Sequence, residues 1–270
     1  MVEITEIFEQ KQVNFVPLLY IVGAGPGDPE LLTVKAQTLL QQADVILFAD
    51  SLVPEQILQL VRPEAEVIPT AHKTLEEILP IMVERVRSQK LVVRLHSGDP
   101  SLYSAVHEQM QALAAADIAF EVVPGISAFQ LAAAKLKLEL TVPGLVQTII
   151  LTRISGRTQV PETEELAALA AHQASLCLYL SARHVQEAQD KLLQHYPADL
   201  PIAICFRLGW ADEKIRVVPL SLMAERTQQE DLTRTTLYVI SPALAAQGTY
   251  AGRSHLYHPA HSHLFRPASH

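Results

Sequence analysis

Short runs rich in β-branched residues alternate with amphipathic segments through most of the chain, and this alternation restricts the possible folds more than any other feature. In the N-terminal half, each apolar run is followed by a short turn and then by apolar residues at helical spacing. Strands and helices in this order favour a mostly parallel sheet that helices cover on both faces. The predicted strands are 18–22, 45–48, 66–68, 91–95 and 120–123, and the predicted helices are 29–42, 75–87, 104–113 and 127–136.

Pro143 and Gly144 interrupt this rhythm, and the strands that follow lie closer together near the C-terminus. Close spacing indicates a mixed or antiparallel second sheet. From Pro242 onward the periodicity is lost, which predicts a surface tail. The predicted strands of this half are 148–151, 176–180, 202–206, 215–218 and 237–240, and the helices are 162–171 and 184–194.

We therefore expect an α/β protein with two α/β domains, a mostly parallel N-terminal sheet and a mixed C-terminal sheet. The expected parts are an N-terminal extension (1–16), a first domain (17–140), a second domain (141–245) and a His-rich tail (246–270).

Composition excludes several classes of protein. The formal net charge of −8 disfavours a nucleic-acid binder, which normally carries a basic excess. No apolar run reaches the roughly 18 residues of a membrane span, and the first twelve residues lack the basic flank and apolar block of a signal peptide. The two cysteines, Cys177 and Cys205, lie in apolar runs rather than in a disulfide pattern. These features predict a cytoplasmic protein without a nucleic-acid or membrane partner.

Three glycine-bearing turns follow strands of the predicted parallel sheet. They are Gly23 to Asp28, Ser97 to Pro100 and Pro124 to Ala128. Parallel strands end at the same edge of a sheet, where ligands of open α/β sheets bind. Glycine lets a backbone approach another group closely, so the three turns together predict a binding crevice for a small molecule. No phosphate-binding lysine loop lies nearby, so the ligand need not carry phosphate.

The first turn also permits a dinucleotide site, because Gly23 and Gly25 match the first two positions of G-x-G-x-x-G and Asp50 follows the second strand. Asp28, however, occupies the third glycine position, where its carboxylate would face a pyrophosphate. Asp28 is better suited to cap a helix that starts at Pro29. A nicotinamide-dependent oxidoreductase and a plain strand-to-helix turn both remain alternatives.

With their flanks, the three turns resemble the tetrapyrrole methylase family: Val22 to Thr33, Ser97 to Tyr103 and Val123 to Ser127. Gln147 to Thr158 and Trp210 to Ile215 resemble, within that family, the branch that methylates carbon 11 of precorrin-4 or cobalt-precorrin-4. The resemblance covers roughly residues 18–266. It implies S-adenosylmethionine as the methyl donor, held in a cleft between the two domains, a tetrapyrrole substrate and a homodimer.

The resemblance also implies roles for individual residues. By their location at the second turn, rather than from the resemblance, His96 and Asp99 are the candidates for handling protons, although a purely structural role for His96 is an alternative. Arg153 and Arg157 would bind the carboxylates of the substrate, for which the planar arginine fork is well suited; the alternative is surface ion pairs with Glu162 or Glu164. The expected cofactor contacts are Pro26, Ser97, Gly98, Asp99, Leu102, Ser127, Ala128, Leu180, Ala203 and Thr236.

The implied reaction is an in-line displacement in which a ring carbon attacks the methyl group of a sulfonium. Because the sulfonium is already activated, orientation and exclusion of water would be the main contributions of the enzyme. A uroporphyrinogen-III or another precorrin methyltransferase, and a non-catalytic tetrapyrrole-binding protein, are the alternatives within this resemblance. No metal is expected: the five tail histidines have no cysteine or acidic neighbour, and prolines interrupt them. They are His255, His258, His261, His263 and His270.

Overall fold

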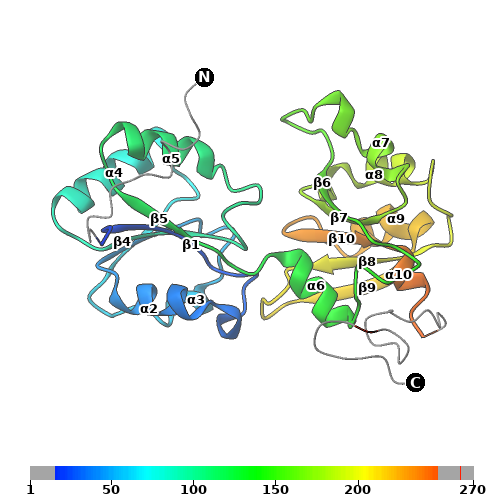
Figure 1. Ribbon diagram of the computed structural model, residues 1–270, viewed down its shortest axis with the longest axis horizontal. Coiled ribbons are helices and arrows are strands. Elements are labelled where there is room, and N and C mark those ends of the chain that lie inside the picture. Colours follow the sequence, from blue (N-terminus) through cyan, green and yellow to red (C-terminus); the bar gives the residue numbers. More distant parts are fainter. Residues whose placement is uncertain (1–15, 249–261, 263–270) are drawn as a thin grey trace. The chain divides into compact units, whose positions relative to one another are not determined.

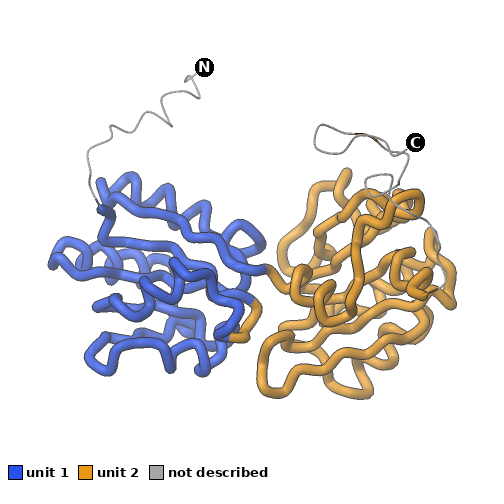
Figure 2. The backbone as a smooth tube through the Cα atoms, turned by 60° about the horizontal axis from the view of Figure 1, so that its bottom comes forward, with its two compact units in different colours: residues 1–25, 29–126 blue, residues 26–28, 127–270 orange. Residues whose placement is uncertain are grey.

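The computed structural model describes residues 16–248 and residue 262 (Figure 1). The chain divides into two compact units, coloured separately in Figure 2. The first unit comprises the chain up to Gly25 and Pro29–Ile126, and the second comprises Pro26–Asp28 and the chain from Ser127 onward. Each unit contains one five-stranded sheet.

All strands of the first sheet are parallel, in the order β3-β2-β4-β1-β5. Their bounds are β1 (Leu19–Gly23), β2 (Val45–Phe48), β3 (Glu66–Pro69), β4 (Val92–His96) and β5 (Phe120–Val123). The helices of this unit are η1 (Pro29–Leu31), α2 (Val34–Gln42), α3 (Glu55–Leu58), α4 (Leu75–Arg87) and α5 (Val106–Ala115).

Helices cover both faces of this sheet. Leu40 of α2 and Ile57 of α3 pack in one core cluster with Val22 and other strand residues. Met82 of α4 and Leu113 of α5 pack in a second cluster with strand residues of the opposite face. Because both faces are buried, β1 and β2 are continuously apolar rather than alternating.

The second sheet is mixed, in the order β6-β7-β10-β8-β9, with β6 and β7 parallel and the other neighbours antiparallel. Its strands are β6 (Ile149–Arg153), β7 (Ser175–Tyr179), β8 (Pro201–Phe206), β9 (Lys214–Pro219) and β10 (Thr236–Ile240). The helices are α6 (Ala128–Leu136), η2 (Glu162–Glu164), α7 (Leu166–Ala170), η3 (Ala182–His184), α8 (Val185–Leu192), η4 (Leu220–Leu222), α9 (Met223–Gln229) and α10 (Pro242–Ala245). The apolar cluster on one face of the sheet joins α7, α8 and α9.

This architecture confirms the predicted fold class, and all ten predicted strands are present within two residues of their expected bounds. The helix predicted for 29–42 is wrong at its start. A 3-10 turn occupies Pro29–Leu31, and α2 begins only at Val34. Thr33 rather than Asp28 caps α2, because its backbone is extended and its hydroxyl accepts a hydrogen bond from the Ala36 N–H at 3.1 Å.

The division between the units falls after Ile126, ahead of the predicted domain boundary at residue 140. Helix α6 accounts for the difference, because it is bonded to the second unit at both ends. A hydrogen bond of 2.8 Å joins the hydroxyls of Ser127 and Tyr179, and Lys135 forms an ion pair with Glu213 at 3.1 Å.

The surface tail predicted from Pro242 onward is wrong for its first residues. Pro242–Ala245 forms a short helix that the Ser241 hydroxyl caps, and Ala243 and Leu244 are buried. The short helices α3 and α9 were not predicted either. Residues 1–15 of the expected N-terminal extension and the tail histidines lie outside the described residues. Within residues 16–248, no helix is long and apolar enough to cross a membrane.

Candidate functional site

The three glycine-bearing turns meet at the carboxyl edge of the first sheet. The first two turns pair through a short antiparallel bridge. The Gly98 N–H donates to the Gly25 carbonyl at 2.7 Å, and the Gly25 N–H donates to the Gly98 carbonyl at 3.2 Å. The turns come together because β4, β1 and β5 are neighbours in the sheet. The prediction that they share one edge is therefore confirmed.

Glycine is required here because the turns contact one another. A Cβ atom on Gly23 would lie 2.6 Å from the Gly125 nitrogen, and one on Gly125 would lie 2.2 Å from the Gly98 oxygen. The sequence pattern predicted that these glycines allow the backbone to approach a small molecule. At Gly23 and Gly125 the close neighbour is instead the backbone of another turn, so these glycines fix the shape of the edge.

Asp99 bonds the second turn to the third. One carboxylate oxygen accepts a hydrogen bond from the Gly125 N–H at 2.9 Å, and the other accepts from the Ser101 N–H at 2.8 Å and from the Ser101 hydroxyl. Burial acts to raise the pKa of Asp99, but the hydrogen bonds from Ser101 and Gly125 outweigh it and lower the pKa below its ordinary value. Ser97, Gly98, Asp99 and Leu102 are all partly exposed, so the predicted second-turn contacts are accessible.

His96 lies beneath this edge, beside a buried cation. Arg94 donates to the Thr70 hydroxyl at 2.9 Å and to the Gln109 amide oxygen at 3.3 Å, and it has no carboxylate partner among the residues that the structure describes. Burial lowers the pKa of Arg94 to about 10, and burial together with Arg94 lowers the pKa of His96 to about 3. His96 is therefore uncharged at neutral pH and its Nε2 atom is buried without a hydrogen bond. This environment favours the structural alternative for His96, and its proton-handling role stays an untested prediction.

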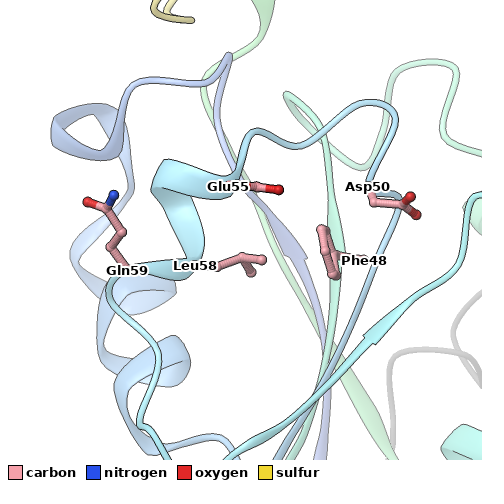
Figure 3. Close-up of a pocket in the computed structure, with 5 residues that line it drawn as sticks. All are labelled: Phe48, Asp50, Glu55, Leu58 and Gln59. Carbon is pink, nitrogen blue, oxygen red and sulfur yellow. The ribbon is translucent and has the colours of Figure 1, made fainter.

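An acidic hollow lies after the end of β2 (Figure 3). Asp50 and Glu55 line it together with Phe48, Leu58 and Gln59. The Asp50 carboxylate accepts a hydrogen bond from the Ala71 N–H at 2.8 Å, which lowers the pKa of Asp50. Two carboxylates make this hollow unsuitable for an anionic ligand.

In the second unit, side-chain hydrogen bonds fix the start of α6. Ser127 is the N-cap of this helix, and its N–H donates to the Gln130 side chain at 2.8 Å. The Tyr179 hydroxyl bonds to the Ser127 hydroxyl and accepts from the Phe129 N–H at 3.1 Å. Tyr179, which the sequence did not single out, thus fixes Ser127 and Ala128 against the end of β7.

Strand register places several polar residues at one edge of the second sheet. Arg153 pairs with Tyr179, and Thr236 pairs with Phe206, which pairs with Lys214. Leu180 follows Tyr179 at this edge.

The three cofactor contacts expected from the second domain differ in accessibility. Leu180 is 66% exposed and has a positive φ of 51°. Thr236 is buried, and its hydroxyl donates to the Leu232 carbonyl at 2.7 Å. Ala203 is fully buried within β8. The structure therefore brings Leu180 and Thr236 to the same edge and leaves Ala203 inside the sheet.

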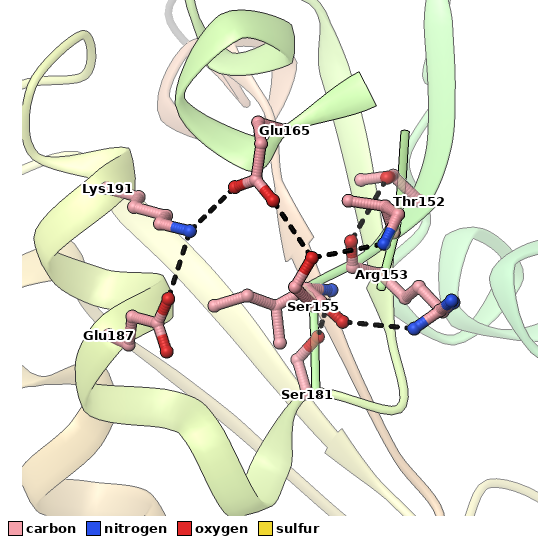
Figure 4. Close-up of polar contacts among 9 residues, drawn as sticks. Thr152, Arg153, Ser155, Glu165, Ser181, Glu187 and Lys191 are labelled. Atoms are coloured by element: carbon pink, nitrogen blue, oxygen red, sulfur yellow. Dashed lines mark hydrogen bonds and ion pairs between the residues drawn. The ribbon is translucent and has the colours of Figure 1, made fainter. Parts of the chain in front are cut away.

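Arg153, the last residue of β6, is labelled in Figure 4, and its side chain holds the loop that follows this strand. Its guanidinium donates to the Thr158 carbonyl at 2.9 Å and to the Gln159 carbonyl at 3.1 Å. The expected alternative, a surface ion pair with Glu162 or Glu164, does not occur for Arg153. Arg157 is exposed and likewise forms no ion pair with any described residue.

The other side of this loop is fixed by a polar network, which Figure 4 also shows. The Ser155 hydroxyl donates to Glu165 at 2.9 Å, and Glu165 forms an ion pair with Lys191 at 2.7 Å. Lys191 also contacts Glu187 at 3.0 Å. The loop is therefore held at both ends, with Arg157 at its exposed part. In the described ranges, no group of three His, Cys, Asp or Glu residues could hold a metal ion.

A family model for tetrapyrrole (corrin/porphyrin) methylases matches residues 18–224, a span that contains all three turns and most of the second sheet. The chain belongs to this family.

Curated relatives of this tetrapyrrole methylase cover almost its whole length. A precorrin-4 C(11)-methyltransferase of Pseudomonas aeruginosa is 42% identical over 249 residues, which are 92% of this chain and 98% of the relative. A cobalt-precorrin-4 C(11)-methyltransferase of Methanocaldococcus jannaschii is 40% identical over 247 residues, or 91% of this chain and 95% of the relative.

Solved structures of the family share the fold. A cobalt-precorrin-4 methyltransferase has a TM-score of 0.81 and 41% identity, covering 84% of this chain and 95% of its own. A uroporphyrin-III C-methyltransferase from Thermus thermophilus, complexed with S-adenosylhomocysteine, has a TM-score of 0.71 and 28% identity, covering 84% and 99%.

Replacing Gly125 by Ala should lower the free energy of unfolding by about 1–3 kcal/mol, because the added methyl group would collide with the Gly98 carbonyl rather than with a movable side chain. Chemical denaturation measures this loss. Gly156→Ala is the matched control, since its nearest neighbour is the His184 imidazole at 3.1 Å. Equal effects of the two substitutions would contradict the interlocking of the turns.

Replacing Asp99 by Asn should destabilise the protein in a pH-dependent way. The pKa of Asp99 is lower in the folded protein than the ordinary value of about 3.9. The ionised carboxylate therefore stabilises the fold above about pH 4, and this contribution is lost as the pH falls through the folded pKa. Unfolding measured from pH 7 to pH 3 should show a difference between the two proteins that shrinks below pH ~4. A difference that stays constant with pH would contradict this role.

Proposed function

We propose that this methylase transfers a methyl group from S-adenosylmethionine to carbon 11 of precorrin-4 or cobalt-precorrin-4 during the synthesis of the corrin ring of cobalamin. The observation that carries the proposal is identity of about 40% over nine-tenths of the chain to relatives with this activity. The likeness to the cobalt-precorrin-4 methyltransferase structure supports it.

The residues at the carboxyl edge of the first sheet fit a sulfonium cofactor. Asp99 is held in its ionised form by hydrogen bonds, and a carboxylate attracts the positive charges of a sulfonium and of an amino group. The turns carry no lysine loop for phosphate, which S-adenosylmethionine does not need. Pro26, Ser97, Gly98 and Leu102 in the first two turns, and Ser127 and Ala128 at the start of α6, complete the proposed contacts, with Leu180, Ala203 and Thr236 in the second sheet.

When bound, S-adenosylmethionine supplies an activated methyl group, so the residues of the chain need to position the reactants and exclude water. The interlocked turns suit this task, because glycine contacts and the bonds of Asp99 fix them before any ligand binds. His96 is uncharged at neutral pH and buried, and it would contribute by supporting the second turn from below.

The substrate carries many carboxylates, and the chain has a formal charge of −8. A locally basic surface is therefore needed. Arg157 is exposed and has no ion-pair partner among the described residues, which leaves its guanidinium available for a carboxylate. Arg153 is committed in part to the loop carbonyls, and would act mainly by fixing the loop that carries Arg157.

We also propose that the enzyme acts as a homodimer in the cytoplasm. The dimer rests on the family resemblance. Cys177 and Cys205 are free and buried, which suits a reducing compartment. Light scattering at micromolar concentration tests the dimer, and a monomer at all concentrations would contradict it.

The proposed reaction is tested by incubating the protein with S-adenosylmethionine labelled in the methyl group and with precorrin-4, with and without cobalt. The label should appear on carbon 11 of the product, and the faster of the two substrates identifies the form used. Transfer to uroporphyrinogen III alone, or binding of NADPH instead of S-adenosylmethionine, would overturn the proposal.

Replacing Arg157 by Ala should raise the KM for the tetrapyrrole about tenfold, the effect of losing one charge-assisted hydrogen bond, and should leave the Kd for S-adenosylhomocysteine unchanged. Steady-state kinetics and calorimetry measure the two quantities. Arg87→Ala, an exposed arginine at the end of α4, is the matched control and should change neither. Loss of cofactor affinity in the Arg157 variant would count against a role in substrate binding.

A further inference from the structure

The segment Pro26–Asp28 of the first glycine turn packs with residues 207–213, which follow β8. Gly27 has a φ of 140°, and a Cβ atom there would lie 2.8 Å from Cδ1 and 3.1 Å from Nε1 of Trp210. Gly209 has a φ of 77°, and a Cβ atom there would lie 2.8 Å from the Asp28 nitrogen. Two glycines thus allow the edge of the indole and the backbone of the turn to meet.

Trp210 is held firmly in this place. The guanidinium of Arg207 stacks on the indole, with 4.0 Å between its central carbon and the ring centroid. An ion pair of 2.6 Å with Asp212 fixes the same guanidinium. The backbone N–H of Trp210 donates to the Arg207 carbonyl at 3.0 Å, and the backbone N–H of Glu213 donates to the Trp210 carbonyl at 3.1 Å. The indole is therefore part of an ordered loop rather than a freely moving surface side chain.

The same loop is bonded to α6. Glu213 accepts a hydrogen bond from the Gly209 N–H at 2.7 Å and forms an ion pair with Lys135 of α6 at 3.1 Å. Helix α6 starts at Ala128, after its cap Ser127. Residues 207–213 thus connect the first glycine turn to the helix that carries the third set of proposed cofactor contacts.

One detail distinguishes this arrangement from ordinary core packing. The indole N–H of Trp210 is buried without a hydrogen-bond partner, beside Gly27. An unsatisfied buried donor destabilises a fold, and such groups concentrate where structure serves function. We therefore expect that the size and shape of the indole matter at position 210, although its unpaired N–H lowers the stability of the fold.

We infer that Trp210 is a positioning residue for the cofactor: it holds Pro26–Asp28 in the conformation that contacts S-adenosylmethionine, through its packing on Gly27. This inference rests on the proposed function, because it assumes that the first turn contacts that cofactor. The inference gives the Trp210–Ile215 motif a structural role, although no residue of this motif takes part in the methyl transfer as proposed.

The chain contains a single tryptophan, so intrinsic fluorescence reports on this position alone. Titration of the unaltered protein with S-adenosylhomocysteine should change the tryptophan emission, and the titration should give the same Kd as calorimetry. Binding by calorimetry without any change in emission would overturn the inference.

Variants separate positioning from general stability. Trp210→Ala should raise the Kd for S-adenosylhomocysteine and the KM for S-adenosylmethionine at least tenfold, whereas Trp210→Phe, which keeps an aromatic ring against Gly27, should stay within about threefold of the unaltered protein. Met223→Ala is the control, because Met223 is fully buried in the core of the same unit and belongs to α9, outside both 26–28 and 207–213. It should lower the melting temperature and leave the Kd unchanged.

Two results would overturn the inference: cofactor affinity in Trp210→Ala equal to that of the unaltered protein, or an equal loss of affinity in Met223→Ala. Failure of the unaltered protein to bind S-adenosylhomocysteine in calorimetry is a different result, because it would refute the proposed function itself.

Discussion

The Gly98 carbonyl lies between Gly23 and Gly125, and the conformation of the whole first-unit edge depends on this contact. A side chain on either glycine would come within 2.7 Å of that oxygen. The bridge between Gly25 and Gly98 and the bonds of Asp99 then close the three turns into one rigid edge. Rigidity of this kind suits methyl transfer, where the donor is already activated and geometry supplies most of the rate.

The second unit uses side chains where the first uses glycine. Tyr179 fixes the start of α6, and Arg153 fixes the loop after β6. The ion pair between Glu213 and Lys135 connects residues 207–213 to α6. These anchors come from strands and helices far apart in the sequence, and they leave Arg157 and Leu180 exposed. The unit therefore combines a fixed frame with a few exposed side chains.

Local patterns predicted the strands well, since runs such as Val45–Phe48 are buried and stay apolar throughout. They also predicted that three turns share one edge, because parallel order alone requires it. Helix starts were less predictable: Asp28 and Thr33 both have side chains that can cap helices, and Thr33 is the one that caps α2. The helix at Pro242–Ala245 is too short to show a period, and its burial under neighbouring elements was not visible in the sequence.

The sequence by itself determined the two α/β sheets, their parallel and mixed character, and the family through the motifs at the strand ends, because these depend on short-range order along the chain. Only the tertiary structure decided which partner each residue meets. It directed Gly23 and Gly125 to other turns rather than to a ligand, placed His96 beside Arg94 in a setting that keeps it uncharged, directed Arg153 to loop carbonyls, and set Trp210 against Gly27. The contacts of Gly23 with Gly125 and of Gly27 with Trp210 join residues many positions apart, and spacing along a chain carries no information about them until the sheets have formed.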